Sequence, residues 1–395
     1  MIGVGPGSAR QCREDFPMNR ARKAGLAGLA CVMLALGTPA HATAADAAKP
    51  ELGDVQKALS ELARSPEVLG TIGALYVDGE KVGSGTAGTR LLGGKGGRIP
   101  ADARFRAGSQ TKPMIQIVIM QLVGEGKLAL DDKLSDLLPV VVEKDLVDRA
   151  DEITVGQMIH HTSGIPNYFD PEVLDPFDFT TNYSPLEIIA LTRTMPRTGE
   201  PGQSYSYSNT NYFLLGLIVE ELTDRSLAAE LERRIFDPAG MDRTYLPVTF
   251  PGRVKGPHGH GYHPGKRGKL VDVDRLNSSY LWAAGGVIST TDDLSSFARA
   301  RAGEKLLSKE LKEAMNAGRP PRDPDQPAPE PPVCEREDGY GVMTGGSFGF
   351  RAMTYSSRDS RVQLVLSNTL SADHSDPAID PLIKKAAEAV LCPAR

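Results

Sequence analysis

Patterns typical of β-strands occur near both ends of this chain, and mainly helical patterns lie between them. Residues 68–88 (VLGTIGALYVDGEKVGSGTAG) predict two strands joined at Asp78-Gly79, because Asp-Gly between apolar runs is a hairpin signal. Residues 350–368 predict a second hairpin, which turns at Ser357–Ser360. Such terminal strands would share one sheet. The sequence therefore predicts one discontinuous α/β domain with a mainly helical lobe inserted at about residues 130–280.

Helical patterns and a proline-rich stretch fill much of the rest. Residues 114–128 are apolar on nearly every side and predict a buried helix, whereas residues 210–226 predict an amphipathic helix. Thr and Asp residues after position 289 are an N-cap signal, and residues 381–391 predict a closing helix. A proline-rich loop is expected over residues 319–333. We expect a functional site in the cleft between the sheet and the helical lobe.

The first 45 residues have the pattern of a signal peptide. Basic residues at positions 20–23 precede an apolar stretch at 24–37, and small residues suited to signal peptidase follow at 40–44. Met18 lies just before the basic residues and is an alternative start. We therefore expect an exported protein, periplasmic or secreted, with a single mature domain over residues 46–395.

Charge and hydropathy limit the partners that this domain could have. The net charge is -5 and the chain has no strong basic block, which disfavours nucleic acid as a partner. No apolar run after the leader is long enough to cross a bilayer. We expect a monomer that acts on a small molecule or a peptide.

Two of the four cysteines fall in the leader. Cys12 and Cys31 would be removed with it, although Cys31 is also the position at which a lipoprotein reading would place the lipid. Cys334 and Cys392 remain, and two cysteines in an exported protein most simply form one disulfide. The alternative is a catalytic thiol, but neither cysteine has a nearby basic residue that would lower its pKa.

Ser109 and Lys112 are three residues apart at the start of the predicted buried helix. This spacing places both side chains on one face, where a poorly solvated lysine can take the proton of a serine nucleophile. The free N–H groups of the first helical turn would help to hold an oxyanion. The alternative is a helix cap followed by a solvated lysine.

Two further segments carry groups that could complete such a site. Tyr207 and Asn209 lie in a loop just before a helix, where a phenolate could act as general base and an amide could bind an ester or amide substrate. Thr344, Gly345 and Gly346 precede the second hairpin, and glycines there allow close approach to a ligand, with Gly346 N–H as a second oxyanion donor. Each segment alone is also explained as a surface loop or a strand entry.

Together, these three motifs resemble the serine β-lactamase/penicillin-binding protein family. The order Ser-x-x-Lys, Tyr-Ser-Asn, Thr-Gly-Gly is similar to that of class C β-lactamases and secreted D-alanyl-D-alanine carboxypeptidases. Residues 153–168 (ITVGQMIHHTSGIPNY) and 282–294 (WAAGGVISTTDDL) also resemble family segments, and the likeness covers roughly residues 55–392. It implies an antiparallel sheet with flanking helices, an acyl-enzyme mechanism and no cofactor.

The resemblance also implies a role for each residue. Ser109 would be the acylated nucleophile, Lys112 its proton partner, Tyr207 the general base and Asn209 a substrate ligand. The N–H groups of Ser109 and Gly346 would form the oxyanion hole. His161, in the His-Thr-Ser-Gly element, is interpreted as structural.

Met343 departs from the family pattern. The family has Lys or His at this position, where a cation helps to bind a substrate carboxylate, and methionine cannot replace it. Arg351 or Arg336 are alternative sources of charge. If neither acts, the neutral cleft would suit esters or uncharged amides.

Four functions therefore remain in view. The leading one is an exported serine hydrolase that resembles a D-Ala-D-Ala carboxypeptidase. The alternatives are an esterase or D-amino-acid peptidase, a class C-like β-lactamase, and a non-catalytic relative that binds cell-wall peptide.

The histidine-rich segment at residues 258–263 (HGHGYH) is a possible metal site. No carboxylate or cysteine near it in the sequence completes a ligand set, so a solvated glycine-broken loop without metal is the expectation.

Overall fold

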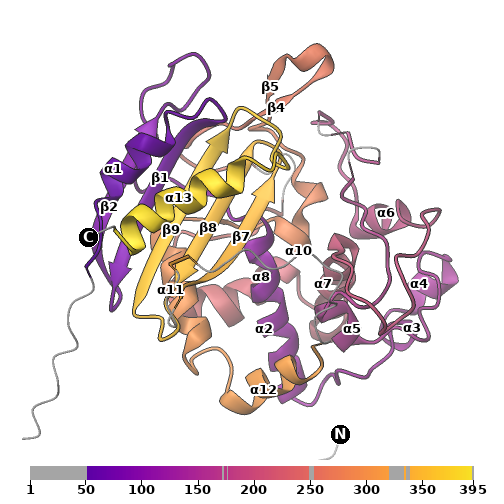
Figure 1. Cartoon of the computed structure of the whole chain (residues 1–395). Helices are drawn as coiled ribbons and strands as arrows, with labels where there is room; N and C mark the ends of the chain where they lie inside the picture. Colours follow the sequence, from indigo (N-terminus) through magenta and orange to yellow (C-terminus); the bar gives the residue numbers. More distant parts are fainter. Residues whose placement is uncertain are drawn as a thin grey trace, which may run out of the picture. The chain divides into compact units, whose positions relative to one another are not determined.

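A five-stranded antiparallel sheet built from both ends of the chain organises the fold (Figure 1). The computed structural model describes residues 51–170, 173–175, 177–248, 253–319, 333–334 and 339–393. The strand order is β2-β1-β9-β8-β7, so strands from the two ends meet where β1 pairs with β9. This confirms the predicted fold class. The strands span Val68–Val77 (β1), Glu80–Gly88 (β2), Gly341–Ser347 (β7), Phe350–Ser356 (β8) and Val362–Leu370 (β9).

Both predicted hairpins are present, and their turns explain the register. Asp78 and Gly79 have φ values of 52° and 90°, as a two-residue turn with positive φ at both central positions requires. The β8–β9 connection turns at residues 357–361, with Ser356 opposite Gln363. Strand β7 pairs only with β8, which leaves the Thr-Gly-Gly motif on an outer edge of the sheet.

Alternating side chains of β1 build two separate cores. Ile72, Ala74 and Tyr76 face a core shared with the helices of the middle of the chain. Leu75 faces the opposite core, which α1 (Val55–Leu62) and α13 (Ile379–Leu391) cover. Figure 1 shows these two helices lying across one face of the sheet. The predicted closing helix is therefore confirmed.

The two longest helices of the larger core carry site residues at their first turns. Helix α2 (Thr111–Gly124) is buried as predicted over most of its length, and Gln116 and Gln121 are among its few partly accessible residues. Helix α7 (Asn209–Thr223) was predicted to be amphipathic, but this prediction was wrong. Its residues from Thr210 to Gly216 are all buried, because short helices and loops surround it on every side.

Short elements make up the remainder. Between residues 130 and 280 lie helices α3 (Leu134–Leu137), α4 (Pro139–Glu143), α5 (Val155–Ile159), α6 (Pro185–Ala190), α8 (Leu227–Leu231), a π-helical turn (Glu232–Phe236), α9 (Asp237–Ala239), and strands β4 (Tyr262–Pro264) and β5 (Leu270–Asp272). Outside this stretch are β3 (Phe105–Arg106), β6 (Ile288–Ser289), α10 (Trp282–Gly285), α11 (Thr291–Ala302) and α12 (Lys309–Ala317). Helix α11 begins after Thr290, whose side chain accepts from Asp293 N as the cap signal predicted.

Cys334 and Cys392 form a disulfide that joins the segment before β7 to the end of α13, with a Cα–Cα distance of 5.9 Å. The leader, Arg336 and most of the proline-rich loop lie outside the described residues. Within the described part of the chain, no helix has the length and apolar character needed to span a membrane.

Candidate active site

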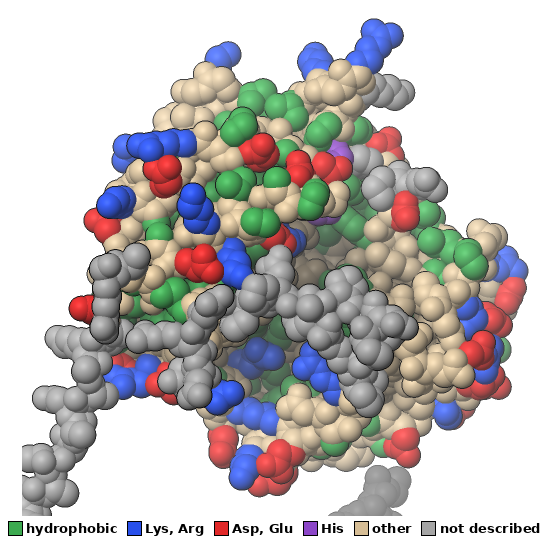
Figure 2. Space-filling model, viewed as in Figure 1, with side chains coloured by type: hydrophobic (Ala, Val, Ile, Leu, Met, Phe, Trp, Pro, Cys, Tyr) green, Lys and Arg blue, Asp and Glu red, His purple; other side chains and the backbone are tan. Residues whose placement is uncertain are grey.

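Ser109 lies in a cleft of about 630 Å³ between strand β7 and the helical part of the molecule. Figure 2 shows a hollow in this face, with Lys and Arg side chains beside it. Ser109 belongs to a 3-10 turn (Gly108–Gln110) that runs directly into α2. Pro113 is tolerated in the first turn of α2, where its missing N–H costs little.

The Lys112 side chain is buried beneath Ser109. Its Nζ lies 3.2 Å from Ser109 Oγ, 2.7 Å from Asn209 Oδ1 and 2.6 Å from the Ala284 carbonyl oxygen. Only 4% of Lys112 is exposed, and this burial holds the lysine pKa well below its usual value. No carboxylate within the described residues offsets the loss of solvation by pairing with Lys112.

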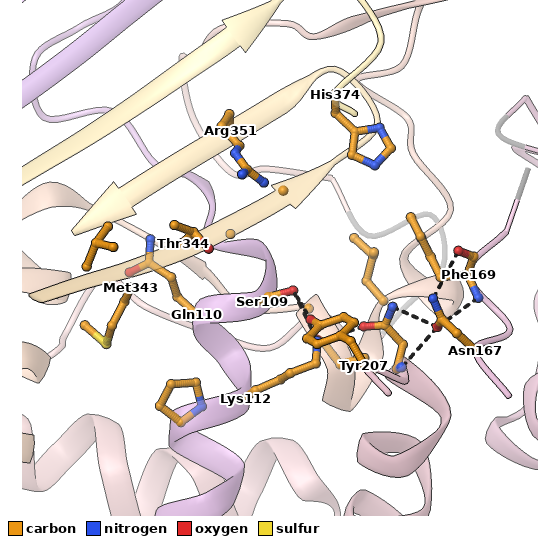
Figure 3. A pocket seen from close by; sticks show the side chains of 18 of the residues that line it. Ser109, Gln110, Lys112, Asn167, Phe169, Tyr207, Met343, Thr344, Arg351 and His374 are labelled. Carbon is orange, nitrogen blue, oxygen red and sulfur yellow. Dashed lines mark hydrogen bonds between the residues drawn. The ribbon is translucent and has the colours of Figure 1, made fainter. Parts of the chain in front are cut away.

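Tyr207 reaches Ser109 from the other side. The Tyr207 Oη and Ser109 Oγ atoms are 2.8 Å apart (Figure 3). Burial raises the pKa of Tyr207 to about 12, against a smaller lowering effect of the hydrogen bond from Ser109. The ring also lies over Lys112 Nζ, 5.0 Å from its centroid. The Tyr207 phenol is therefore protonated at neutral pH, and a general-base role for Tyr207 during the reaction stays a prediction.

His161 holds the Tyr207 loop in place. Its ring packs against Tyr207 with centroids 4.6 Å apart, and its Nδ1 accepts a hydrogen bond from Ser208 N at 3.1 Å. Burial is the main cause that lowers the pKa of His161 to about 3. The neutral ring is thus a positioning residue for Tyr207. The structural role that was expected of His161 is therefore to hold Tyr207 in place.

Asn209 is held between Lys112 and Asn167. Its Oδ1 accepts from Lys112, while its Nδ2 and backbone N donate to Asn167 Oδ1 at 3.1 and 3.0 Å. The sequence suggested that Asn209 binds substrate. In the structure, its carbonyl oxygen accepts from Lys112 and its amide nitrogen donates to Asn167 Oδ1, and substrate binding by Asn209 stays a prediction.

Strand β7 approaches the Ser109 turn so closely that only glycines fit. Gly108 has φ 58°, and a Cβ there would lie 2.7 Å from Gly346 N. A Cβ on Gly345 would lie inside the contact distance of the Ala107 carbonyl oxygen and 3.1 Å from Ser109 N. The backbone nitrogens of Ser109 and Gly346 therefore lie close to this contact between β7 and the Ser109 turn, and their role as an oxyanion hole stays a prediction.

The register of β7 leaves the Gly346 N–H free of its partner strand. Ser347 and Phe350 flank a two-residue turn, and the ladder continues without a shift to the pair Gly346–Arg351. The residues that flank such a turn are the hydrogen-bonded pair, and bonded and non-bonded pairs alternate along an antiparallel ladder. The N–H of Gly346 thus points away from β8, towards the Ser109 turn.

The cleft is not neutral, although Met343 and Thr344 line it as expected. The Arg301 guanidinium, from the last turn of α11, contacts Met343 Sδ at 3.6 Å. The sequence had suggested Arg351 or Arg336 as the source of charge, whereas the cation that reaches Met343 comes from α11. Among the described residues that line the cleft are three arginines, Arg301, Arg319 and Arg351, and no carboxylate.

The cation suggested from sequence is differently placed. Arg351 lines the cleft, but its guanidinium makes two contacts to the carboxylate of Asp380, which balances its charge. Arg301 and Arg319, which also line the cleft, form no ion pair among the described residues. Arg301 is thus better placed than Arg351 to meet an anionic ligand.

The histidine-rich segment is not a solvated loop. His258 and His263 are buried, and the fold brings to the segment carboxylates that are distant in sequence. Asp274 Oδ1 lies 2.6 Å from His258 Nε2, and Asp272 Oδ2 lies 2.8 Å from His260 Nδ1. The expected absence of a carboxylate near these histidines was therefore wrong.

Sequence reasoning missed three contributors to the site. Asn167 and the Ala284 carbonyl hold Asn209 and Lys112, and both lie in the segments 153–168 and 282–294 that had been noted only for their resemblance. Nothing in the sequence indicated that Arg301 belongs to the site, because it lies 42 residues before Met343. The helix that carries Arg301 has the pattern of an ordinary solvated helix.

Known proteins are similar to this chain in sequence and in fold. The family model described as Beta-lactamase matches residues 55–388. Penicillin-binding protein 4 of Amycolatopsis lactamdurans is 30% identical over 198 residues, which are 50% of this chain and 49% of that protein. A putative D-alanyl-D-alanine carboxypeptidase of Escherichia coli K12 is 30% identical over 141 residues, 34% of this chain and 31% of that protein.

A solved structure matches over a greater length. The D-stereospecific amidohydrolase from a Streptomyces species has a TM-score of 0.68 and 28% identity, with 86% of this chain and 98% of that chain covered. By contrast, the matches to curated relatives such as the penicillin-binding proteins span about half of their length. The family model covers most of this chain, and the chain therefore belongs to the beta-lactamase family of serine hydrolases.

Proposed function

We propose that this chain is an exported serine hydrolase that forms an acyl-enzyme on Ser109, with D-amino-acid peptides of the D-Ala-D-Ala type as substrates. The observation that carries the proposal is the position of Ser109 Oγ, within hydrogen-bond distance of both Tyr207 Oη and Lys112 Nζ. Export rests on the leader pattern of residues 1–45 alone.

In this proposal Lys112 takes the proton of Ser109. A neutral amine has two N–H groups and one lone pair, and two of its three neighbours, Asn209 Oδ1 and the Ala284 carbonyl, can only accept. These two oxygens use both N–H groups, so the lone pair faces the Ser109 hydroxyl. Burial of Lys112 favours this neutral form, because the charged form loses its solvation there.

The remaining steps use the groups around Ser109. Ser109 Oγ attacks the substrate carbonyl carbon as its proton moves to Lys112, and the oxyanion accepts from the N–H groups of Ser109 and Gly346. The protonated Tyr207 gives its proton to the leaving amine and regains one from Lys112. Water then attacks the acyl ester, its proton passes back along the same groups, and Ser109 is restored.

The charge of the cleft supports substrates with a free carboxylate beside the scissile bond. Arg301 and Arg319 form no ion pair among the described residues, and the described lining contains no carboxylate to repel an anion. The names of the relatives point the same way, since carboxypeptidases of D-alanyl-D-alanine cleave next to such a group.

A second candidate is a D-amino-acid amidase or esterase. Met343 favours it, since the apolar thioether occupies the position at which the family motif has a cation, and the Streptomyces relative is named for D-stereospecific amide hydrolysis. A β-lactamase and a non-catalytic binder of cell-wall peptide remain alternatives, but neither has a specific observation in its favour.

The test is a hydrolysis panel on the purified mature protein. It contains a D-Ala-D-Ala peptide, the same peptide as its C-terminal amide, a p-nitrophenyl ester and a chromogenic β-lactam. We expect turnover of the D-Ala-D-Ala peptide in excess of its amide, complete loss in Ser109→Ala, and full activity in the control Ser206→Ala. Preference for the amide would favour the amidase, and turnover by Ser109→Ala would refute the serine mechanism.

A further inference from the structure

Two groups of histidines and carboxylates lie near the β4–β5 hairpin, and their hydrogen bonds distinguish them. In the first group, His258 Nδ1 contacts the Gly256 carbonyl at 2.6 Å and Nε2 contacts Asp274 at 2.6 Å, while His260 Nδ1 contacts Asp272. Protein acceptors therefore already occupy both His258 nitrogens and one His260 nitrogen. The hydrogen-bonding needs of this group are therefore largely met by the protein itself.

The second group is His263 on β4 with Asp373 and His374 in the loop between β9 and α13. One nitrogen from each imidazole and one Asp373 oxygen lie within 4.8 Å of one another. The Nδ1 atoms of His263 and His374 are both buried without a hydrogen-bond partner among the described residues. Only 7% of His263 is exposed, so its unpaired Nδ1 is costly unless another group satisfies it.

The carboxylate of this group is held in position. Asp373 Oδ1 accepts from Ser375 N at 2.9 Å and from Ser375 Oγ at 2.7 Å, and it lies 3.4 Å from His374 Nδ1. These hydrogen bonds fix the carboxylate in the way that supporting contacts fix metal ligands.

The surroundings of the group also suit a cation. Arg351, which lines the cleft together with His374, is paired with Asp380. Phe348 packs edge-on against both rings, with centroids 5.0 Å from His263 and 5.2 Å from His374, and helps to exclude water.

We propose that His263, Asp373 and His374 bind one divalent cation of the zinc class. Two imidazole nitrogens and one carboxylate oxygen are the borderline donor set that Zn²⁺ and Co²⁺ prefer, and three protein ligands leave a fourth position open. His374 lines the active-site cleft beside Arg351 (Figure 3), so the bound ion adds positive charge at the cleft wall. This site goes beyond the proposed hydrolase activity, and its occupancy is measured without substrate.

The test uses tag-free mature protein stripped with a chelator. Zn²⁺ binding is measured by titration calorimetry and by metal analysis after dialysis, and Co²⁺ is titrated while its visible absorption is followed. We expect one ion per chain, a rise in Tm with Zn²⁺, and intensified Co²⁺ absorption typical of a four-coordinate site. His374→Ala and Asp373→Asn should each weaken binding by about 100-fold or more, since loss of even a supporting contact costs 10–100-fold.

The first histidine group provides the matched control. His260→Ala removes a histidine from the same hairpin region and should leave Zn²⁺ affinity unchanged. Melting curves recorded without metal show whether each variant is folded. If His374→Ala is not folded, His263→Gln serves as a second ligand variant. Absence of stoichiometric binding to the wild type, or binding that His260→Ala abolishes and His374→Ala keeps, would overturn the proposal.

Discussion

Burial sets the protonation state of the groups around Ser109. Lys112 and His161 are both buried, and burial favours the neutral form of each. A neutral amine can accept a proton, and a neutral imidazole can accept the hydrogen bond of Ser208. The phenol of Tyr207, which is 40% exposed, is neutral at pH 7 even at its ordinary pKa and can donate a proton.

His161 should make stability depend on pH in mildly acidic solution. Its folded-state pKa of about 3 lies below the usual 6.5, so the unfolded chain binds a proton that the folded protein excludes. The stability from the neutral ring is present above pH 6.5 and is lost as pH falls towards 3. Between about pH 6.5 and pH 5 the loss should approach about 2 kcal/mol.

The measurement is the denaturant midpoint against pH for wild type and His161→Asn. Asparagine keeps an acceptor and tolerates the positive φ of 57° at this position. The variant should be less stable at neutral pH and should show a flatter decline on acidification. Equal slopes for the two proteins would contradict the assignment.

Arg301 should set the preference for carboxylate substrates. Arg301→Gln removes the cation at Met343, so kcat/KM for a D-Ala-D-Ala peptide should fall about 10–100-fold, as expected for a charged hydrogen bond of about 1.5–3 kcal/mol. The C-terminal amide of the peptide should change by less than about threefold. Arg299→Gln is the control, since Arg299 bonds Ser295 and Gln363 away from the cleft. An equal fall for both substrates would remove Arg301 from this role.

At the scale of single residues, the sequence indicated side chains that the structure brings together around Ser109, and their roles stay predictions. Ser109 and Lys112 could be paired because helical spacing fixes their separation. The raised pKa of Tyr207 could not be predicted, because it depends on segments far away in the chain. The same holds for Arg301, whose position follows from the packing of α11 against β9, β8 and β1.

At the scale of elements, the contact between β7 and the Ser109 turn is the critical one. Gly345→Ala would place a methyl group against the Ala107 carbonyl, which should cost about 1–3 kcal/mol of stability. The displaced strand would also move Gly346 N–H from the oxyanion position, and kcat/KM should fall by about 100-fold. Gly341→Ala, on the same strand, meets nothing closer than 3.9 Å and is the control. Wild-type activity in Gly345→Ala would show that the strand does not hold the oxyanion hole.

Elements that begin or end at a characteristic turn or cap residue could be predicted from the sequence. Features that depend on which segments pack around an element could not. The turn residues Asp78 and Gly79 located the first hairpin, and the Thr290 cap located α11. The burial of α7 was missed, because a helix in the centre of a core has partners on every side that its own sequence does not show. The short pair β4–β5 has too few residues for a strand period.

At the scale of the whole molecule, the disulfide joins the end of α13 to the segment before β7, the strand that carries the third motif. Cys334 and Cys392 enclose 58 residues, for which the chain-entropy model gives about 4 kcal/mol as an upper figure. Cys334→Ser with Cys392→Ser should therefore lower the free energy of unfolding by about 2–4 kcal/mol, measured by denaturant titration. Reductant should lower the denaturant midpoint of the wild type and leave the midpoint of the double variant unchanged. A wild-type midpoint that does not respond to reductant would argue that the two thiols are not joined.

The overall architecture was predictable because both chain ends carry strong strand patterns, and strands so far apart must share a sheet to bury their apolar faces. The carboxylates near the histidine-rich segment were not, because Asp274 and Asp373 reach it only through tertiary packing. Long-range proximity of this kind has no signature in the local sequence.

The most direct test of the account is the site of acylation. The mature protein is incubated with a fluorophosphonate or a penicillin, and intact mass and peptide mapping locate the adduct. We expect one adduct per chain on the peptide that contains Ser109, absent in Ser109→Ala and retained in Ser206→Ala. The rate of labelling should fall as Lys112 becomes protonated on acidification. An adduct on another residue, or an undiminished adduct in Ser109→Ala, would contradict the central claim.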